Sequence, residues 1–113
     1  MHELAVTQRV LDIALEKAKE AQANRVASIN LVIGEMSSIA DDCMQFYFDF
    51  LSQDSPASGA TLSFKRIPTQ LGCRRCGHSF TLNSPPWKCP QCEQWDVEIQ
   101  AGQELYIDSI EVE

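Results

Sequence analysis

Four cysteines, arranged as two Cys-x2-Cys pairs, constrain the fold of this 113-residue chain more than any other feature. The pairs, "CRRC" and "CPQC", are separated by twelve residues and contain Cys73, Cys76, Cys89 and Cys92. Two residues between cysteines let both sulfurs of one turn point at the same ion, and two such turns complete a tetrahedron of thiolates around Zn(II). Few apolar residues surround these cysteines, so zinc binding would supply much of the local folding free energy. The spacing predicts a four-cysteine zinc-ribbon domain, for which we take residues 69–96.

Other uses of paired cysteines compete with a structural zinc site. Two disulfides are disfavoured, because the chain begins without the basic and apolar segments of a secretory signal. A redox centre requires a thioredoxin-like strand-to-helix setting, which neither pair has. A ribbon that binds nucleic acid is the main rival, since Arg74 and Arg75 lie within the first pair.

Charge argues against that rival. The ribbon segment carries three cations against two carboxylates, a formal balance of +1, and four thiolates around Zn(II) turn this into −1. The whole chain has a net charge of −7, whereas duplex binding depends on neutralising phosphates with Lys and Arg. Its apolar runs are too short for a membrane span. We therefore expect a cytoplasmic protein with no nucleic-acid or membrane partner. Because a zinc ion held by four thiolates has no open coordination position, we also expect the zinc to have no catalytic role.

Outside the cysteine-rich segment, the spacing of apolar residues predicts two helices and three strands. Apolar residues recur every three, four and seven positions over residues 4–23, which indicates an amphipathic helix. A strand is expected over 26–35, a second helix over 37–53, and a second strand over 60–68 that ends at Pro68. Residues 103–113 alternate and then change phase, which indicates a third strand with a bulge or with burial on both faces.

The second helix is predicted to be heavily buried. Its apolar residues are Met44, Phe46, Tyr47, Phe48, Phe50 and Leu51. Cys43 lies among them, and we expect it to be an inert buried thiol.

The order of these elements predicts an α+β fold, in which two helices pack on a small three-stranded sheet and the zinc ribbon is inserted before the last strand. The core would comprise residues 1–68 plus 97–113. The alternative places 97–113 with the insert, but two strands alone would make a marginal sheet.

The N-terminus, Met1-His2-Glu3, has the chemistry of a second metal site. The terminal amine, the His2 imidazole and the intervening amide nitrogens form fused chelate rings suited to Ni(II) or Cu(II). Glu3 could add an oxygen ligand or orient the imidazole. With only two histidines, His2 and His78, no nucleophilic triad can be assembled, and no nucleotide-binding loop is present, so we expect no enzymatic activity.

Four segments together resemble the HypA/HybF family of hydrogenase nickel-incorporation proteins across essentially the whole chain. They are "MHELAVTQRVLDI", "LVIGEMSSI", the Cys-x2-Cys pairs and "LYIDSIEVE". The resemblance implies that His2, with Glu3 and the Met1 amine, binds nickel and that the four cysteines bind structural zinc.

The resemblance also implies a function and partners. The chain would be a metallochaperone that helps to deliver Ni(II) to the large subunit of [NiFe]-hydrogenase, together with the GTPase HypB. The alternative is a zinc-ribbon nucleic-acid-binding or adaptor protein without a nickel role. The sequence leaves open which hydrogenase is served, whether the chain forms a homodimer, and what His78, Asp41 and Asp42 do.

Overall fold

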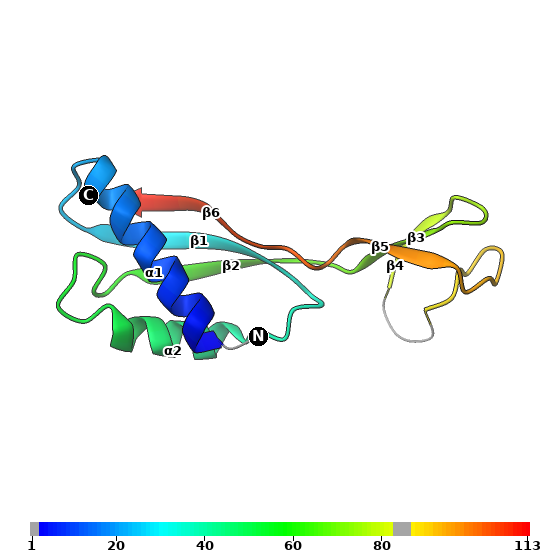
Figure 1. Cartoon of the computed structure of the whole chain (residues 1–113), viewed down its shortest axis with the longest axis horizontal. Helices are drawn as coiled ribbons and strands as arrows, with labels where there is room; N and C mark the ends of the chain where they lie inside the picture. Colours follow the sequence, from blue (N-terminus) through cyan, green and yellow to red (C-terminus); the bar gives the residue numbers. More distant parts are fainter. Residues whose placement is uncertain (1–2, 83–86) are drawn as a thin grey trace. The chain divides into compact units, whose positions relative to one another are not determined.

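The computed structural model describes residues 3–82 and 87–113 and divides the chain into two compact units. The first unit comprises the chain up to Val32 together with 38–65 and 106–113, and the second comprises 33–37 and 66–105. Each unit is built around one three-stranded sheet. The elements, in chain order, are α1 (Glu3–Glu20), β1 (Val26–Gly34), α2 (Asp41–Leu51), β2 (Thr61–Ile67), β3 (Gln70–Cys73), β4 (Ser79–Thr81), β5 (Val97–Ala101) and β6 (Leu105–Val112) (Figure 1).

Helix α1 is amphipathic, as its apolar spacing predicts, and ends three residues earlier than expected. It buries one stripe against the sheet, formed by Thr7, Val10, Leu11, Ala14 and Ala18. The helix stops because Gln22 adopts a left-handed conformation with φ of 55°. The N–H of Gln22 donates to the carbonyl of Lys19 at 3.1 Å, and that of Ala23 to the carbonyl of Ala18 at 2.9 Å, the paired bonds that close a helix end.

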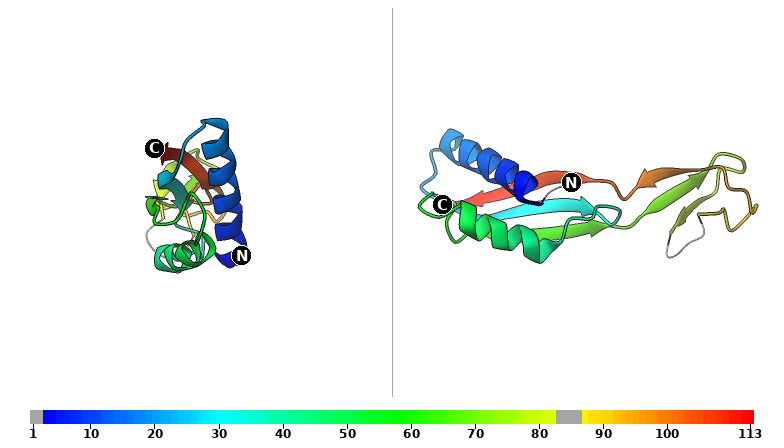
Figure 2. Two further views of the ribbon diagram at one scale, coloured as in Figure 1. Left: turned by 90° about the vertical axis from the view of Figure 1, so that its left-hand side faces the viewer. Right: turned by 60° about the horizontal axis from the view of Figure 1, so that its bottom comes forward.

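The sheet of the first unit has the strand order β2-β1-β6 and carries both helices on one face (Figure 2). The arrows of β1 and β2 point the same way and β6 runs opposite to them. Ile29 and Leu31 of β1 are buried. The alternate residues Ser28 and Asn30 form hydrogen bonds with β6, the second of them from the Asn30 amide to the Ser109 hydroxyl at 2.8 Å.

Helix α2 is less buried than its composition predicts. Met44 and Phe48 are fully buried, but Phe46 and Phe50 are 69% and 65% exposed, so the expectation of burial is wrong for these two. The cause is geometric, because a helix packed on one side buries only one stripe. Cys43 is also exposed, which corrects its prediction as a buried thiol. No described helix is long and apolar enough to cross a membrane.

The second unit contains an antiparallel sheet in the order β4-β3-β5. Leu71 at its centre is fully buried and lies opposite Phe80 on β4 and Ile99 on β5. The chain after Asp96 therefore supplies β5 to this sheet and β6 to the other. The predicted fold class, two helices on a three-stranded sheet with a separate cysteine cluster, is confirmed.

The turn after β1 is held within the second unit by backbone contacts. The N–H groups of Gly34 and Met36 donate to the carbonyls of Glu104 at 2.8 Å and Gly102 at 2.9 Å, and that of Glu35 to Ile67 at 2.8 Å. A side chain at Gly34 would collide with the backbone of Gly102. Glycine is required here by this close approach of two backbones.

Candidate metal sites

The four predicted zinc ligands come together at the end of the second unit's sheet. Their sulfur atoms all lie within 4.8 Å of one another. Cys73 and Cys92 are 3.5 Å apart, and Cys76 and Cys89 are 3.7 Å apart, measured between sulfurs. Zn–S bonds of about 2.3 Å place the sulfurs of a regular tetrahedron about 3.8 Å from one another. The cluster therefore has the donor set and the size that Zn(II) requires.

The first Cys-x2-Cys turn is shaped by two backbone hydrogen bonds. The N–H of Gly77 donates to the carbonyl of Cys73 at 3.0 Å, and the N–H of Cys73 donates to the carbonyl of His78 at 2.8 Å. Gly77 is left-handed, with φ of 80°, a conformation that glycine adopts without steric cost. The N–H groups of Arg75 and Cys76 lie 3.4 and 3.5 Å from the sulfur of Cys73. This turn thus directs both of its sulfurs into the cluster and places backbone donors at the Cys73 sulfur.

The second Cys-x2-Cys turn repeats the first almost bond for bond. The N–H of Glu93 donates to the carbonyl of Cys89 at 2.9 Å, and the N–H of Cys89 donates to the carbonyl of Gln94 at 3.0 Å. Glu93 occupies the position of Gly77 and is also left-handed, with φ of 62°. A residue with a side chain is strained in this conformation. The sequence analysis missed this feature, although aligning the two cysteine pairs would have placed Glu93 beside Gly77.

The cysteine thiols differ in acidity because backbone donors, burial and contacts between sulfurs combine differently at each of them. The N–H groups of Cys76 and, to a smaller extent, Arg75 lower the pKa of Cys73 from 9.0 to about 6, against the opposing effect of burial. The N–H of Gln94 lowers the pKa of Cys92, but burial and the contacts with the other three sulfurs outweigh it and raise the pKa to about 12. Of these two thiols, Cys73 is therefore the stronger acid.

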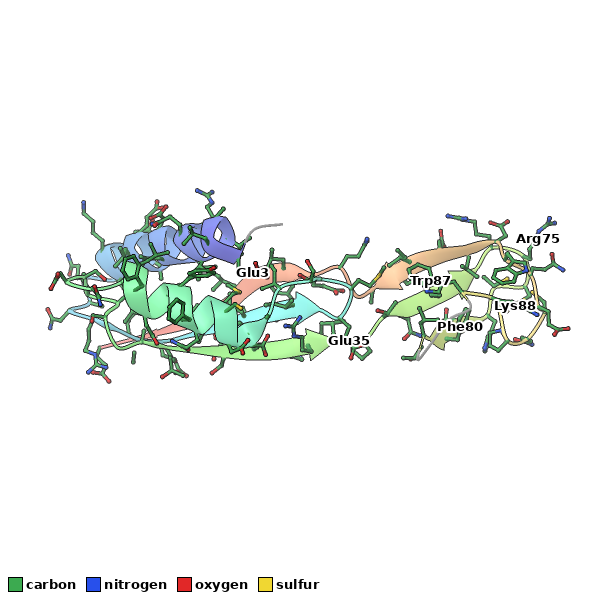
Figure 3. All side chains as sticks on the ribbon, turned by 90° about the horizontal axis from the view of Figure 1, so that it is seen from below. Glu3, Glu35, Arg75, Phe80, Trp87 and Lys88 are labelled. Carbon is green, nitrogen blue, oxygen red and sulfur yellow. The ribbon has the colours of Figure 1, made fainter. Side chains whose placement is uncertain are left out.

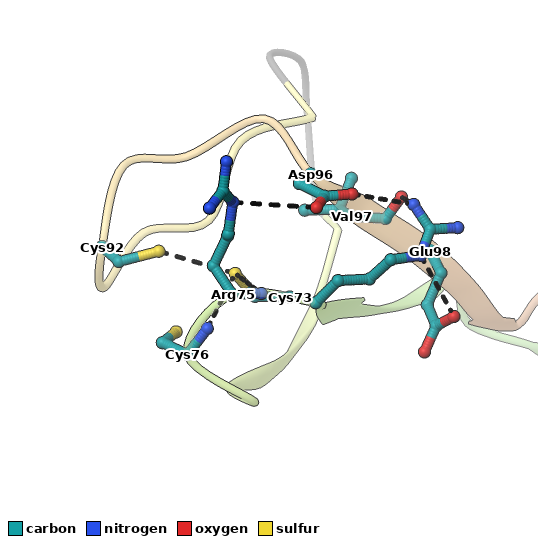
Figure 4. A network of polar contacts seen from close by, with 8 residues as sticks. Cys73, Arg75, Cys76, Cys92, Asp96, Val97 and Glu98 are labelled. Atoms are coloured by element: carbon teal, nitrogen blue, oxygen red, sulfur yellow. Dashed lines mark hydrogen bonds and ion pairs between the residues drawn. The ribbon is translucent and has the colours of Figure 1, made fainter.

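The two arginines of the first pair are engaged by carboxylates (Figure 4). Arg74 contacts Asp96 at 2.9 Å and Glu98 at 3.5 Å, and Arg75 contacts Asp96 at 3.8 Å. The hydrogen bond from Arg74 to Asp96 raises the pKa of the guanidinium. Because neighbouring carboxylates already balance both positive charges, the arrangement gives little support to the nucleic-acid-binding alternative.

Aromatic side chains of the second unit contact one another and Lys88, and none of the described ones belongs to the cysteine cluster. His78 stacks on Phe80 with ring centroids 5.9 Å apart, and in the described part of the chain the metal-binding cluster contains cysteines alone. The Lys88 ammonium lies 5.9 Å from the centre of the Trp95 ring and 3.6 Å from the Glu93 carboxylate. Figure 3 labels Phe80 and Lys88 in this unit.

The predicted nickel site is described only at its third residue. Met1 and His2 lie outside the described residues. Glu3 begins α1, and its carbonyl accepts a hydrogen bond of 2.5 Å from the hydroxyl of the buried Thr7 (Figure 3). Asp42 in the first turn of α2 accepts a hydrogen bond from the N–H of Cys43 at 3.0 Å. Glu3 is thus hydrogen-bonded to Thr7, a buried residue one helical turn after it.

Comparisons with known proteins agree on one family. The family model described as "Hydrogenase/urease nickel incorporation, metallochaperone, hypA" matches residues 1–112. The hydrogenase maturation factor HypA of Dehalococcoides mccartyi (strain ATCC BAA-2266 / KCTC 15142 / 195) is 47% identical over 113 residues, which cover 100% of this chain and 95% of that protein.

Two solved structures resemble the whole chain. The solution structure of the Ni metallochaperone HypA from Helicobacter pylori has a TM-score of 0.67 and 26% identity, and the match covers 99% of this chain and 97% of the other. A second solution structure, described as HypA protein, has a TM-score of 0.76 and 27% identity over 99% of this chain and 96% of its own. By their descriptions, the matched proteins are maturation factors and metallochaperones and not enzymes.

Proposed function

The chain belongs to the HypA family of hydrogenase/urease nickel-incorporation metallochaperones, and on this basis we propose that it binds Ni(II) at its own N-terminus and helps to insert it into the large subunit of [NiFe]-hydrogenase. The prediction that the chain is not an enzyme is confirmed by its relatives. Nickel is thus the cargo, and the four-cysteine cluster suits zinc as the resident metal.

In our proposal, Ni(II) is held by the amine of Met1, the imidazole of His2 and the amide nitrogens between them. The start of α1 at Glu3 supports this ligand set. The first N–H groups of a helix have no acceptor within it, so the amide nitrogen of Glu3 can give up its proton to a metal without loss of a helical hydrogen bond. The Glu3 carboxylate adds an oxygen ligand or orients the imidazole.

The zinc site would have a structural role only. Cys73, Cys76, Cys89 and Cys92 supply all four positions of a tetrahedral ion, which leaves none open for substrate. Among the described residues of the second unit, the fully buried large side chains include Leu71 and Cys89 but few others. Such a small core is consistent with a unit whose folding depends on its metal.

Delivery requires that nickel be released as well as bound. A terminal site with exchangeable ligands suits this better than a closed cage, and protonation of the amine and imidazole would weaken binding as pH falls. The sequence carries no nucleotide-binding loop, so we assign any energy-driven step to a partner, the GTPase HypB, acting with the chain in the cytoplasm.

Nickel titration of two histidine variants tests the proposal. His2→Ala should abolish the nickel site while zinc content, measured by elemental analysis, stays at one ion per chain. His78→Ala is the matched control, because it removes the only other histidine of the chain. Full nickel binding by His2→Ala, or equal losses in both variants, would refute the terminal site and favour an adaptor that holds zinc alone.

A further inference from the structure

We infer that the outer edge of β6 is a docking site for an extended, basic and apolar segment of a partner protein. The segment would add a strand beside β6 and fill an apolar groove between β6 and α1. This inference goes beyond the proposed function, because it does not depend on where nickel binds.

The first observation is an uncovered edge. β6 ends the strand order β2-β1-β6, and within the described residues β1 is its one sheet neighbour (Figure 1). An edge strand offers unpaired N–H and C=O groups, and proteins usually protect such edges with charged side chains, especially Lys, or with Pro. β6 has no Lys or Pro, its charged side chains Asp108 and Glu111 are both acidic, and its Tyr106 and Val112 are 52% and 38% exposed. The edge is therefore long, partly apolar and open to strand addition.

The second observation is a groove beside this edge. A cavity of about 350 Å³ is lined by Ile13 and Lys17 of α1 and by residues 107–110 of β6. Ile13, Ile107 and Ile110 are all half-buried, so the groove is bounded by partly exposed aliphatic side chains. A strand paired with β6 would send every second side chain toward the α1 side, into this groove.

The third observation is charge, which identifies the kind of segment that fits. Residues 104–113 carry four carboxylates and no Lys or Arg. Asp108 is exposed and lines the groove, whereas the other three carboxylates, those of Glu104, Glu111 and Glu113, already contact the Gly102 N–H, the Ser28 hydroxyl and Arg25. Lys17, a cation that lines the groove, is paired with Glu20 at 3.3 Å. A segment that alternates apolar residues with Lys or Arg would complement both the groove and the carboxylates.

The same charges disfavour a second copy of this chain as the occupant. An antiparallel pair of β6 strands would bring the carboxylates of both copies onto one short ladder without a cation between them. Like charges across neighbouring strands destabilise pairing. The occupant is therefore a partner of opposite charge.

The test uses the full zinc-loaded chain and a short synthetic peptide of alternating Val and Lys with blocked ends. Binding is followed by amide NMR and hydrogen exchange. We expect saturable binding that protects amides of β6 and shifts the methyl signals of Ile13 and Ile107. Two control peptides are matched in length, one with Glu in place of Lys and one with alternate amides N-methylated to block strand pairing. Neither should bind.

Matched charge reversals locate the site. Asp108→Lys should weaken binding of the Val-Lys peptide roughly tenfold, since one favourable cross-strand pair becomes unfavourable. Asp54→Lys makes the same charge change at an exposed turn after α2 and should leave affinity within about twofold. The inference is overturned if no binding saturates, if either control peptide binds as well, if both reversals weaken binding equally, or if protection falls on α2.

Discussion

The two Cys-x2-Cys turns make a built-in comparison, because the same left-handed position holds glycine in one and glutamate in the other. A side chain at this φ costs about 1–2 kcal/mol, whereas glycine adopts it freely. Glu93→Gly removes that strain but adds conformational entropy to the unfolded chain, which costs up to about 1 kcal/mol. The Lys88–Glu93 ion pair, 3.6 Å long with the glutamate 76% exposed, contributes little. We expect a net gain of about 0.5 kcal/mol.

The reverse change at the first turn should have the opposite sign. Gly77→Ala meets no atom of the described residues within 4 Å of the added Cβ, so we attribute its effect to φ. We expect a loss of about 1 kcal/mol. Because zinc binding and folding of this unit are coupled, both effects should appear in the zinc dissociation constant, measured by competition with a chelator. The expected changes are about twofold tighter for Glu93→Gly and about fivefold weaker for Gly77→Ala.

Glu93→Ala separates backbone strain from charge. It removes the carboxylate as glycine does but keeps a Cβ in the left-handed conformation, so its zinc affinity should be no tighter than that of the parent chain. If Glu93→Gly binds zinc no more tightly than Glu93→Ala, or if Gly77→Ala binds like the parent, the strain argument fails.

Two further predictions address the core of the first unit. Phe48→Ala should destabilise the first unit by about 3–5 kcal/mol in chemical unfolding, whereas Phe46→Ala, at a 69% exposed position, should change stability by about 0.5 kcal/mol or less. Equal losses of stability would contradict the observation that Phe48 is buried and Phe46 is exposed. Ser52→Ala should raise the unfolding midpoint, with a gain of about 1 kcal/mol, because the Ser52 hydroxyl is fully buried and has no hydrogen-bond partner among the described residues.

The zinc cluster and the main elements could be predicted from sequence because their signals are local. Each Cys-x2-Cys turn brings its own two sulfurs together, and a tetrahedral site then requires the two turns to meet. They do meet, since the sulfur of Cys73 in the first turn lies 3.5 Å from that of Cys92 in the second. Apolar periodicity likewise located both helices and the strands β1, β2 and β6 to within a few residues.

The remaining features depend on contacts between distant residues. Periodicity alone does not show which aromatic residues of α2 face the sheet, so Phe46 and Phe50 could not be separated from Phe48. The pairing of β5 with β3 joins residues more than twenty positions apart, and the sequence of β5, "VEIQA", does not indicate which strand it pairs with. The groove beside β6 exists only because α1 lies across that strand.

Nickel titration of two forms of the chain tests the central claim most directly. One form begins at Met1, and the other carries a few residues before it, so that the amine is moved while His2 and Glu3 stay in place. Our account predicts one nickel ion bound by the native form, much weaker binding by the extended form, and equal zinc content in both. Equal nickel affinity in the two forms would contradict the account, since the terminal amine would then not be a ligand.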